Sequence, residues 1–207
     1  MIPVNVLAVR YLSAATEDLC KALGAPVGYP CLGLITTDCD DATYIALDEA
    51  TKSAEVQVCF GSSFYAGAAT ASTPNAGEVL GILAATTPGA VRSGMEAAVG
   101  ALERIGFEQA GEVPYLAYTV SSCGSFLAKE AGVPEGSSLA YLIAPPLESM
   151  YGLDYALKAA DVKLCKLYSP PSPTNFGGGL LTGTRSACAA ACGAFAEAVA
   201  EVAQRPK

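Results

Sequence analysis

The sequence predicts an α/β protein made of two similar domains in tandem, each a small sheet flanked by helices. The chain has 207 residues, which is enough for two domains of about 100 residues each. Similar segments occur twice in the same order, and in both halves predicted strands alternate with predicted helices. The boundary falls near residues 107–112, so we expect one domain over residues 1–108 and a second over residues 109–207.

Three sequence matches indicate an internal duplication. Residues 47–59 match residues 153–165 at an offset of 106, with seven of 13 positions identical. At an offset of 108, the matched residues are Ser13, Leu19, Gly24, Pro26 and Gly28 with Ser121, Leu127, Gly132, Pro134 and Gly136. Farther along, the matched residues are Arg92, Ser93 and Gly100 with Arg185, Ser186 and Gly193. Because the matches are collinear and the offset changes in stretches rich in glycine and proline, we interpret them as two copies of one domain.

Each copy is expected to begin with a strand and a short helix. Residues 4–12 and 115–120 predict the strand, because they are mostly apolar and rich in β-branched or aromatic residues. In the first copy, Ser13 or Thr16 can cap the helix that follows, and Gly24 ends it.

The middle of each copy predicts a strand, a helix and a second strand. The second strand alternates apolar with other residues, and Asp41 is a plausible N-cap for the helix of the first copy. In the two copies, the expected ranges are 32–37 and 140–144 for the first strand, 42–54 and 149–160 for the helix, and 56–60 and 162–167 for the second strand.

Each copy is expected to end with a long loop, a strand and an amphipathic helix. Glycine, serine and proline are frequent in the loops, residues 61–77 and 169–179, and the strands follow at residues 79–84 and 180–182. The final helices carry apolar residues at three-and-four spacing, which predicts one buried face. These are Val91, Met95, Ala98, Val99, Leu102 and Ile105 in the first copy, and Ala187, Ala190, Ala191, Ala194, Phe195, Ala198, Val199 and Val202 in the second.

The composition favours burial of much of the surface against other protein subunits. The chain is 52% hydrophobic and only 15% charged. No uninterrupted apolar run approaches the roughly 20 residues of a membrane-spanning helix, and the N-terminus lacks the pattern of a signal peptide. We therefore expect a cytoplasmic protein with no membrane partner. The net charge of −8 without a basic cluster disfavours nucleic acid and is compatible with a cationic small molecule.

Catalytic and metal chemistry find little support in the sequence. Histidine, the commonest general base and metal ligand, is absent. The eight cysteines form no C-x-x-C pair, and we interpret them as reduced, small apolar residues. Cys188 and Cys192 lie one helical turn apart, but no further ligand is near them in sequence. Cys39 lies between Asp38 and Asp40, whose charges oppose thiolate formation. We expect no enzyme, no metal and no cofactor.

Five segments resemble tandem-domain bacterial microcompartment shell proteins, the ethanolamine-utilisation type most closely. They are residues 32–52, 63–69, 76–80, 140–148 and 181–188, within a resemblance that extends over nearly the whole chain. The resemblance implies a ferredoxin-like fold in which the two domains are circularly permuted. It also implies a homotrimer shaped like a flat hexamer, which tiles with other shell proteins around encapsulated enzymes. An ethanol- or choline-type compartment is the alternative within the family.

The resemblance further implies two kinds of pore. The central pore would be gated by the two long loops, with Phe64 and Tyr65 in the first loop and Asn175 and Phe176 in the second. The small pore would hold a small amino alcohol and would be lined by Asp40, Glu78, Thr182 and Gly183. The chemistry is suitable, because an ammonium group binds to carboxylates and a hydroxyl group binds to a threonine or backbone partner.

The residues themselves leave other interpretations open. The long loops can be surface loops with an aromatic anchor, and an acidic residue before a helix can be a cap. The duplicated domains can form a soluble small-molecule binding or sensor module that builds no shell. An enzyme that uses Asp40 with Glu78 is a third interpretation, which requires a turnover that is lost in the Glu78→Gln variant.

Overall fold

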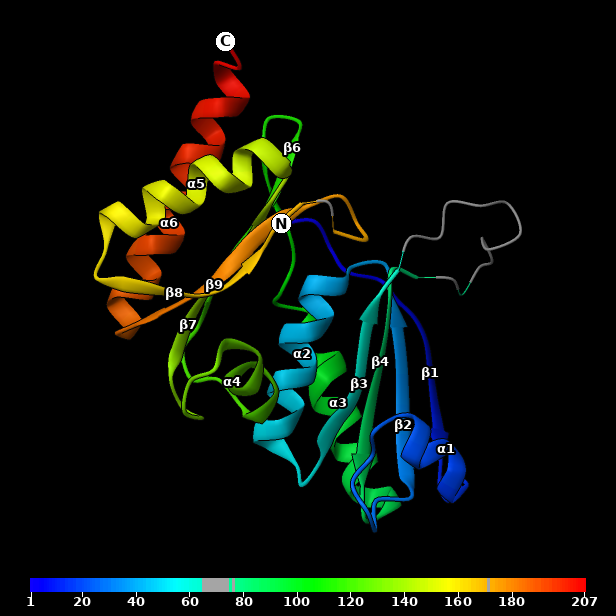
Figure 1. Ribbon diagram of the computed structural model, residues 1–207. Helices are drawn as coiled ribbons and strands as arrows, with labels where there is room; N and C mark the ends of the chain where they lie inside the picture. Colours follow the sequence, from blue (N-terminus) through cyan, green and yellow to red (C-terminus); the bar gives the residue numbers. More distant parts are fainter. Residues whose placement is uncertain (65–74, 76, 171) are drawn as a thin grey trace. The chain divides into compact units, whose positions relative to one another are not determined.

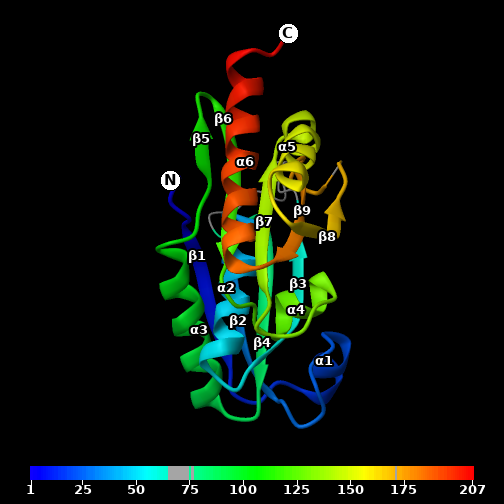
Figure 2. The ribbon, with the colours of Figure 1, turned by 90° about the vertical axis from the view of Figure 1, so that its left-hand side faces the viewer.

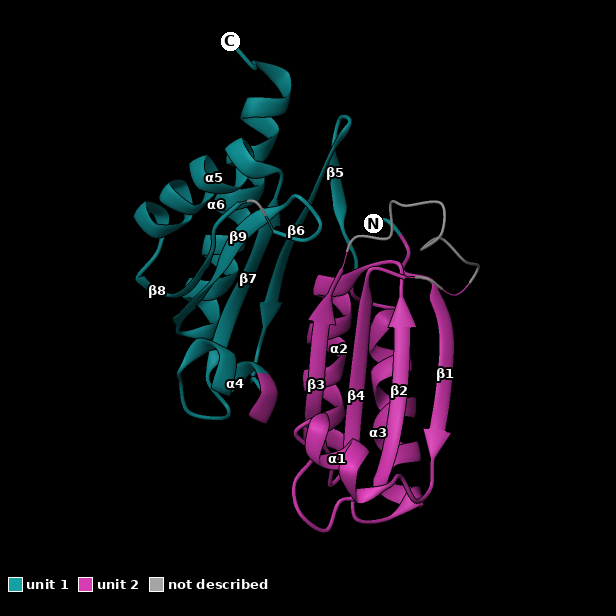
Figure 3. Ribbon diagram, turned by 45° about the vertical axis from the view of Figure 1, so that its right-hand side comes forward, with its two compact units in different colours: residues 1–2, 106–123, 127–207 teal, residues 3–105, 124–126 magenta. Residues whose placement is uncertain are grey.

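The structure, a computed structural model, describes residues 1–64, 75, 77–170 and 172–207. The chain divides into two compact units, which are coloured separately in Figure 3. Unit 1 comprises residues 1–2, 106–123 and 127–207, and unit 2 comprises residues 3–105 and 124–126. Each unit is an antiparallel sheet with flanking helices, which confirms the predicted α/β class.

Unit 2 contains a four-stranded sheet with the order β1-β2-β4-β3 (Figure 1). Its elements are β1 (Val6–Leu12), α1 (Glu17–Ala22), β2 (Cys31–Thr37), α2 (Asp40–Ser53), β3 (Gln57–Ser63), β4 (Val79–Ala85) and α3 (Pro88–Leu102). Helices α2 and α3 cover one face of the sheet and α1 covers the other, as Figure 3 shows. Both central strands are almost entirely buried, so they need apolar residues along their whole length.

Unit 1 contains a five-stranded sheet with the order β5-β6-β7-β9-β8. Its elements are β5 (Glu108–Ala110), β6 (Val113–Val120), α4 (Ser125–Ala131), β7 (Ser138–Ala144), α5 (Pro146–Ala159), β8 (Val162–Tyr168), β9 (Gly177–Gly183) and α6 (Arg185–Gln204). The first two residues of α4 belong to unit 2. Helices α5 and α6 pack on the core formed by strands β7 and β9 (Figure 2). Phe195 of α6 is completely buried at the centre of this core.

The two units share local geometry at the offsets read from the sequence. The order β1-β2-β4-β3 corresponds to β6-β7-β9-β8. Gly28 and Gly136, at the offset of 108, both have φ of +85°, and Gly24 and Gly132 have φ of +73° and +67°. The ladder of β3 is interrupted between Val58 and Phe60, and that of β8 is interrupted between the residues at the offset of 106. Turns and irregularities are thus repeated together with the strands.

The third sequence match is wrong by one helical turn. Helix α3 begins after its N-cap Thr87, and helix α6 begins after its N-cap Thr184. The side chain of each threonine accepts a hydrogen bond from the backbone N–H three residues later. The two caps are 97 residues apart, whereas the match of Arg92 with Arg185 requires 93. A shift of four residues moves a position by only about 40° around a helix. The apolar stripes of α3 and α6 therefore still overlap when the two helices are aligned four residues out of register.

Three further boundaries differ from the prediction. Helix α2 begins one residue before Asp41, and its N-cap is Cys39, which makes no side-chain cap bond. Strand β9 begins at Gly177, because the glycine run lies between two strands and leaves no room for side chains. A Cβ atom on Gly178 would lie 1.8 Å from the carbonyl oxygen of Leu142. The hairpin of β5 with β6 was not predicted.

Helix α6 is the one helix in the described part of the chain that is long and apolar enough to cross a membrane. Its apolar residues are used inside unit 1, where Cys188, Ala191, Cys192, Phe195 and Val199 join the core. Ala190, which was expected in the stripe, is exposed, and the two cysteines occupy the buried face in its place. Core helices commonly satisfy a hydropathy test of this kind, so the helix is weak evidence for a membrane span.

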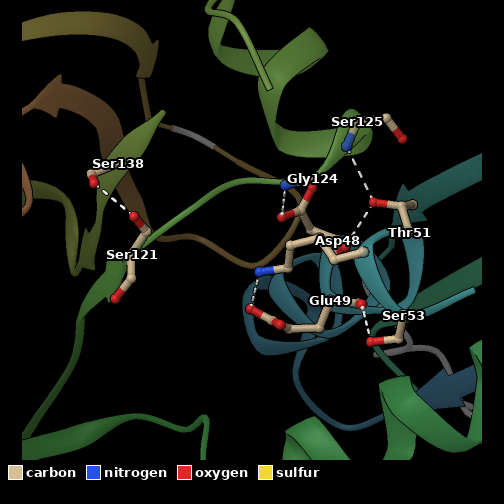
Figure 4. Close-up of polar contacts among 9 residues, drawn as sticks. Asp48, Glu49, Thr51, Ser53, Ser121, Gly124, Ser125 and Ser138 are labelled. Carbon is tan, nitrogen blue, oxygen red and sulfur yellow. Dashed lines mark hydrogen bonds and ion pairs between the residues drawn. The ribbon is translucent and has the colours of Figure 1, made fainter. Parts of the chain in front are cut away.

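The start of α4 is held on helix α2 within unit 2. The backbone N–H of Gly124 donates to Oδ2 of Asp48 over 2.7 Å, and the N–H of Ser125 donates to Oγ1 of Thr51 over 3.2 Å (Figure 4). The Thr51 hydroxyl in turn donates to the backbone oxygen of Asp48 over 2.8 Å. Asp48 is fully buried, so the N–H of Gly124 donates to its carboxylate in place of water.

Gly124→Ala is expected to lower the free energy of unfolding by about 1–3 kcal/mol, the usual cost of overpacking. A Cβ atom there would lie 2.2 Å from Oγ1 of Thr51 and 2.7 Å from the oxygen of Asp48. Urea denaturation measures the change. Gly100→Ala is the control, because Gly100 lies in α3 with nothing within 4 Å of its Cβ position, and it should stabilise by about 0.5–1 kcal/mol. Equal effects of the two variants would contradict the packing argument.

Candidate functional site

Three carboxylates gather at one end of the sheet of unit 2. We name Asp38, Asp40 and Glu78 the acidic cluster. Strands β2 and β4 are antiparallel neighbours, and Thr37 pairs with Val79. The residues just after β2 and just before β4 are therefore adjacent, and the N–H of Glu78 donates to the oxygen of Thr37 over 2.8 Å. The structure brings Asp40 and Glu78 together as the resemblance implied, with their charges close enough to interact.

Asp38 and Asp40 already have hydrogen-bond donors. Asn5, just before β1, donates its backbone N–H to one oxygen of Asp38 over 2.8 Å and its side-chain amide to the other over 2.7 Å. Asp40 is buried and accepts from the N–H of Asp41 over 2.9 Å. It also lies in the first turn of the 14-residue helix α2, where the helix dipole favours negative charge. These interactions allow two acidic residues to remain close together.

The backbone between Asp38 and Asp40 is fixed by two threonines. Oγ1 of Thr37 accepts from the N–H of Cys39 over 3.1 Å and donates to the oxygen of Cys39 over 2.9 Å. Thr37 and Thr43 are fully buried, and their hydroxyls lie 2.6 Å apart. The sequence interpretation missed Asn5 and Thr37, because their roles depend on the register of β1 with β2 and not on a motif.

The pKa of Glu78, a member of the acidic cluster, and the pKa of the neighbouring Cys39 are both raised. Partial removal from water raises the pKa of Glu78, and the negative charges of Asp40 and Asp38 raise it further. Burial strongly raises the pKa of Cys39, and the charges of Asp41, Asp40 and Glu78 add to it. Cys39 is therefore a thiol without nucleophilic character at neutral pH, as the sequence predicted.

The base of the first predicted gate loop adjoins the acidic cluster. Phe64 follows β3 directly, and its N–H donates to the backbone oxygen of Glu78 over 2.9 Å. Its side chain is exposed. Tyr65, the other residue predicted to gate from this loop, lies outside the described residues.

The second predicted gate loop has an anchored aromatic ring. Phe176 lies edge-on to Phe107 with ring centroids 5.5 Å apart, and its N–H donates to Oγ of Ser172 over 3.0 Å. Asn175 is exposed and has a left-handed backbone with φ of +63°. In this conformation Phe176 anchors the loop, as in the alternative interpretation of a surface loop with an aromatic anchor.

The other two residues predicted for the small pore lie at the end of β9 in unit 1. Thr182 donates its hydroxyl to the oxygen of Ser138 over 3.0 Å. Gly183 has no room for a side chain, because a Cβ atom would lie 2.8 Å from the oxygen of Asp161. Asp40 and Glu78 belong to unit 2, so the four residues predicted for the small pore form one pair in each unit.

The cysteines behave as small apolar residues. All eight are free thiols, and Cys31, Cys123, Cys188 and Cys192 are buried. Burial raises the pKa of Cys192 to about 11. In the described ranges no group of three or more histidine, cysteine, aspartate or glutamate residues is placed to hold a metal ion.

Comparisons with known proteins agree with this architecture. Residues 31–113 match the BMC domain family. The chain is 54% identical over its full length to the bacterial microcompartment shell protein EutL of Clostridium perfringens, covering 97% of that protein, and 46% identical to EutL of Escherichia coli, covering 96%. It also superposes on the crystal structure of ethanolamine utilization protein EutL from Leptotrichia buccalis. That superposition has a TM-score of 0.96 at 57% identity, over 99% of this chain and 96% of that one.

A more distant structural neighbour shows how far the fold extends. EtuB from Clostridium kluyveri superposes with a TM-score of 0.79 at 22% identity, over 95% of this chain and 87% of that one, a likeness of fold alone. The EutL relatives are 45–54% identical over the whole chain, which separates them from such neighbours. The chain therefore belongs to the EutL family of bacterial microcompartment shell proteins, and it is a structural subunit of a shell that lies in the bacterial cytoplasm.

Proposed function

We propose that three copies of this chain form a flat tile of the shell, with a gated central pore and small pores that pass an amino alcohol such as ethanolamine. The tile joins other shell proteins in a layer around encapsulated enzymes and catalyses no reaction itself. The observation that carries the transport part is the acidic cluster, in which the carboxylate of Glu78 interacts electrostatically with those of Asp40 and Asp38. Residues 1–108 and 109–207 are the two shell domains in this proposal.

A small primary ammonium ion suits the chemistry of the cluster. Asp38 is bound at both oxygens by Asn5, which leaves Asp40 and Glu78 for a ligand. A cation between these two carboxylates would offset the repulsion that raises the pKa of Glu78. Each charge-assisted hydrogen bond to the ammonium group would contribute roughly 1.5–3 kcal/mol. Thr182 and Gly183 stay predicted partners for the hydroxyl end of the ligand.

The loops that follow β3 and precede β9 suit a gate. Phe64, at the base of the first loop, donates its N–H to the backbone oxygen of Glu78, so this predicted gating residue lies beside the acidic cluster. Opening or closing by the second loop would require Phe176 to leave the ring of Phe107, a contact that contributes about 0.5–1.5 kcal/mol beyond its burial. That cost is small enough for a two-state gate.

The assembly is tested by measuring the mass and shape of the purified protein. Light scattering should give three times the chain mass of 21.0 kDa, and negative-stain microscopy should show discs that extend into sheets at high concentration. A stable monomer or dimer that never forms sheets would refute the shell tile and would favour the soluble binding module.

The ligand site is tested by calorimetric titration of the wild type with ethanolamine. Asp40→Asn keeps the oxygen that accepts from Asp41 but removes the charge, so affinity should fall roughly 10- to 100-fold. Glu55→Gln, at an exposed carboxylate outside the cluster, should leave affinity unchanged. Ethylene glycol, which has no ammonium group, should not bind. Equal ethanolamine affinity in Asp40→Asn and the wild type would disprove the assignment.

The raised pKa of Glu78 predicts a pH-dependent effect on stability. The folded state holds this proton more tightly than the unfolded chain, so ionisation costs stability as pH rises above the usual 4.5. Glu78→Gln removes that cost and should raise the free energy of unfolding at pH 7, with a difference that disappears below pH 4.5. Thermal melts across this range measure the effect. A difference that persists unchanged at low pH would mean that packing, and not charge, is responsible.

A further inference from the structure

Residues 1–2 pack against the segment that leads into β5. They belong to unit 1, whereas residues 3–105 belong to unit 2 (Figure 3). The backbone N–H of Ile2 donates to the carbonyl oxygen of Phe107 over 2.5 Å. Atom Cγ of Met1 lies 3.1 Å from the Cβ position of Gly106. We name residues 1–2, Gly106 and Phe107 the N-terminal clasp.

The local sequence favours this pairing. Ile2 is β-branched and precedes Pro3, and both properties favour an extended backbone. Gly106 leaves room for the paired segment, because a Cβ atom there would overlap the carbonyl oxygen of Ile2. The φ of Gly106 is not positive, so steric room is the reason for a glycine at this position. Pro3 has no N–H to donate, which limits the pairing to the first two residues.

The N-terminal clasp positions the aromatic ring that contacts the second predicted gate loop. Ile2 binds the backbone of Phe107, and β5 begins at the next residue, Glu108, which pairs with Tyr115 of β6. The ring of Phe107 lies edge-on to that of Phe176, with centroids 5.5 Å apart. Both phenylalanines are only partly buried, so their positions depend on these contacts as well as on the packing of the core.

We propose that the N-terminal clasp is a positioning device for the second gate loop. By fixing the backbone of Phe107, it keeps the ring of this residue where Phe176 can pack against it, and so it holds the loop in the conformation seen in the structure. This inference rests on the proposed function, because it specifies what holds one of the two proposed gate loops.

The energetics of an aromatic pair support this role. An edge-on contact depends on the direction of both rings, so it is formed only when both are held in place. The entropy lost in ordering one backbone residue is comparable with the free energy gained from one such pair. If Phe107 were free to move, forming the contact would gain little. When Ile2 has already ordered Phe107, nearly the whole free energy of the contact is available to hold the loop.

Hydrogen–deuterium exchange of the purified full-length protein, followed by mass spectrometry, tests the proposal. The probe is the peptide that covers residues 172–179, in which the N–H of Phe176 donates to Oγ of Ser172. Gly106→Ala breaks the N-terminal clasp without changing the loop, and a second variant that lacks residues 1–2 removes it. In both variants, exchange in this peptide should accelerate roughly 2- to 10-fold, the factor that corresponds to the loss of one aromatic pair.

Gly193→Ala is the matched control within the same unit. Gly193 is exposed in α6, and nothing lies within 4 Å of its Cβ position, so exchange of residues 172–179 should equal that of the wild type. A peptide from the buried part of α6 is the internal reference, and its exchange should be the same in every variant. Equal acceleration in this reference peptide would mean that unit 1 as a whole is destabilised, and it would overturn the inference.

A double-mutant cycle with Phe107 separates positioning of the ring from general support of the fold. Phe107→Leu keeps the backbone bond from Ile2 but removes the ring, so it should accelerate exchange as much as Gly106→Ala does. Adding Gly106→Ala to Phe107→Leu should cause no further acceleration, because the clasp acts on the loop through this ring. Additive effects, or wild-type exchange in both clasp variants, would overturn the inference.

The outcome for the N-terminal clasp can be told apart from that for the proposed function. The exchange of residues 172–179 reports on contacts within unit 1 and requires no assembly. A wild type that stays monomeric in light scattering would overturn the proposed function, whereas the exchange rates would still decide whether the clasp holds the loop.

Discussion

The antiparallel pairing of β2 with β4 is the constraint on which the candidate site depends. It places the residue after Thr37 beside the residue before Val79, so two carboxylates far apart in sequence become neighbours. Nearly every residue of the two strands is buried, and a slip of one residue would exchange the side chains that pack on the two faces of the sheet. Gly77 adds a steric limit, because a Cβ atom there would lie 2.0 Å from the oxygen of Thr37. The core of unit 2 therefore sets the distance between the acidic residues.

The same pairing in unit 1 ends in different residues. Strands β7 and β9 repeat the geometry of β2 and β4, yet Pro146 begins α5 where Asp40 begins α2, and Phe176 precedes β9 where Glu78 precedes β4. Duplication thus kept the frame and allowed the two ends to specialise, one acidic and one apolar.

Much of the fold could be predicted from the sequence, because the repeat and the apolar periodicity are properties of the chain itself. Strand β2 and helices α2 and α5 lie within a few residues of their predicted ranges. What was missed depends on tertiary neighbours. The glycine run at the start of β9 has the composition of a loop, and only the backbones on either side make it a strand. The alignment of α3 with α6 failed because a stripe of small apolar residues matches itself nearly as well after one turn.

The candidate site was predicted only in part, for a similar physical reason. The family resemblance can indicate Asp40 and Glu78. The residues that stabilise the cluster, such as Asn5, are placed beside it by the register of the strands, which the resemblance does not give. Asn5 carries no charge, but it donates two hydrogen bonds to the carboxylate of Asp38. The dipole of helix α2 stabilises the negative charge of Asp40 in its first turn. Partial burial raises the pKa of Glu78, and the nearby charges of Asp40 and Asp38 raise it further. Asp38 therefore has a donor from the chain at each oxygen, and in the proposed function Asp40 and Glu78 are the two carboxylates of the cluster that a cation from solution would bind.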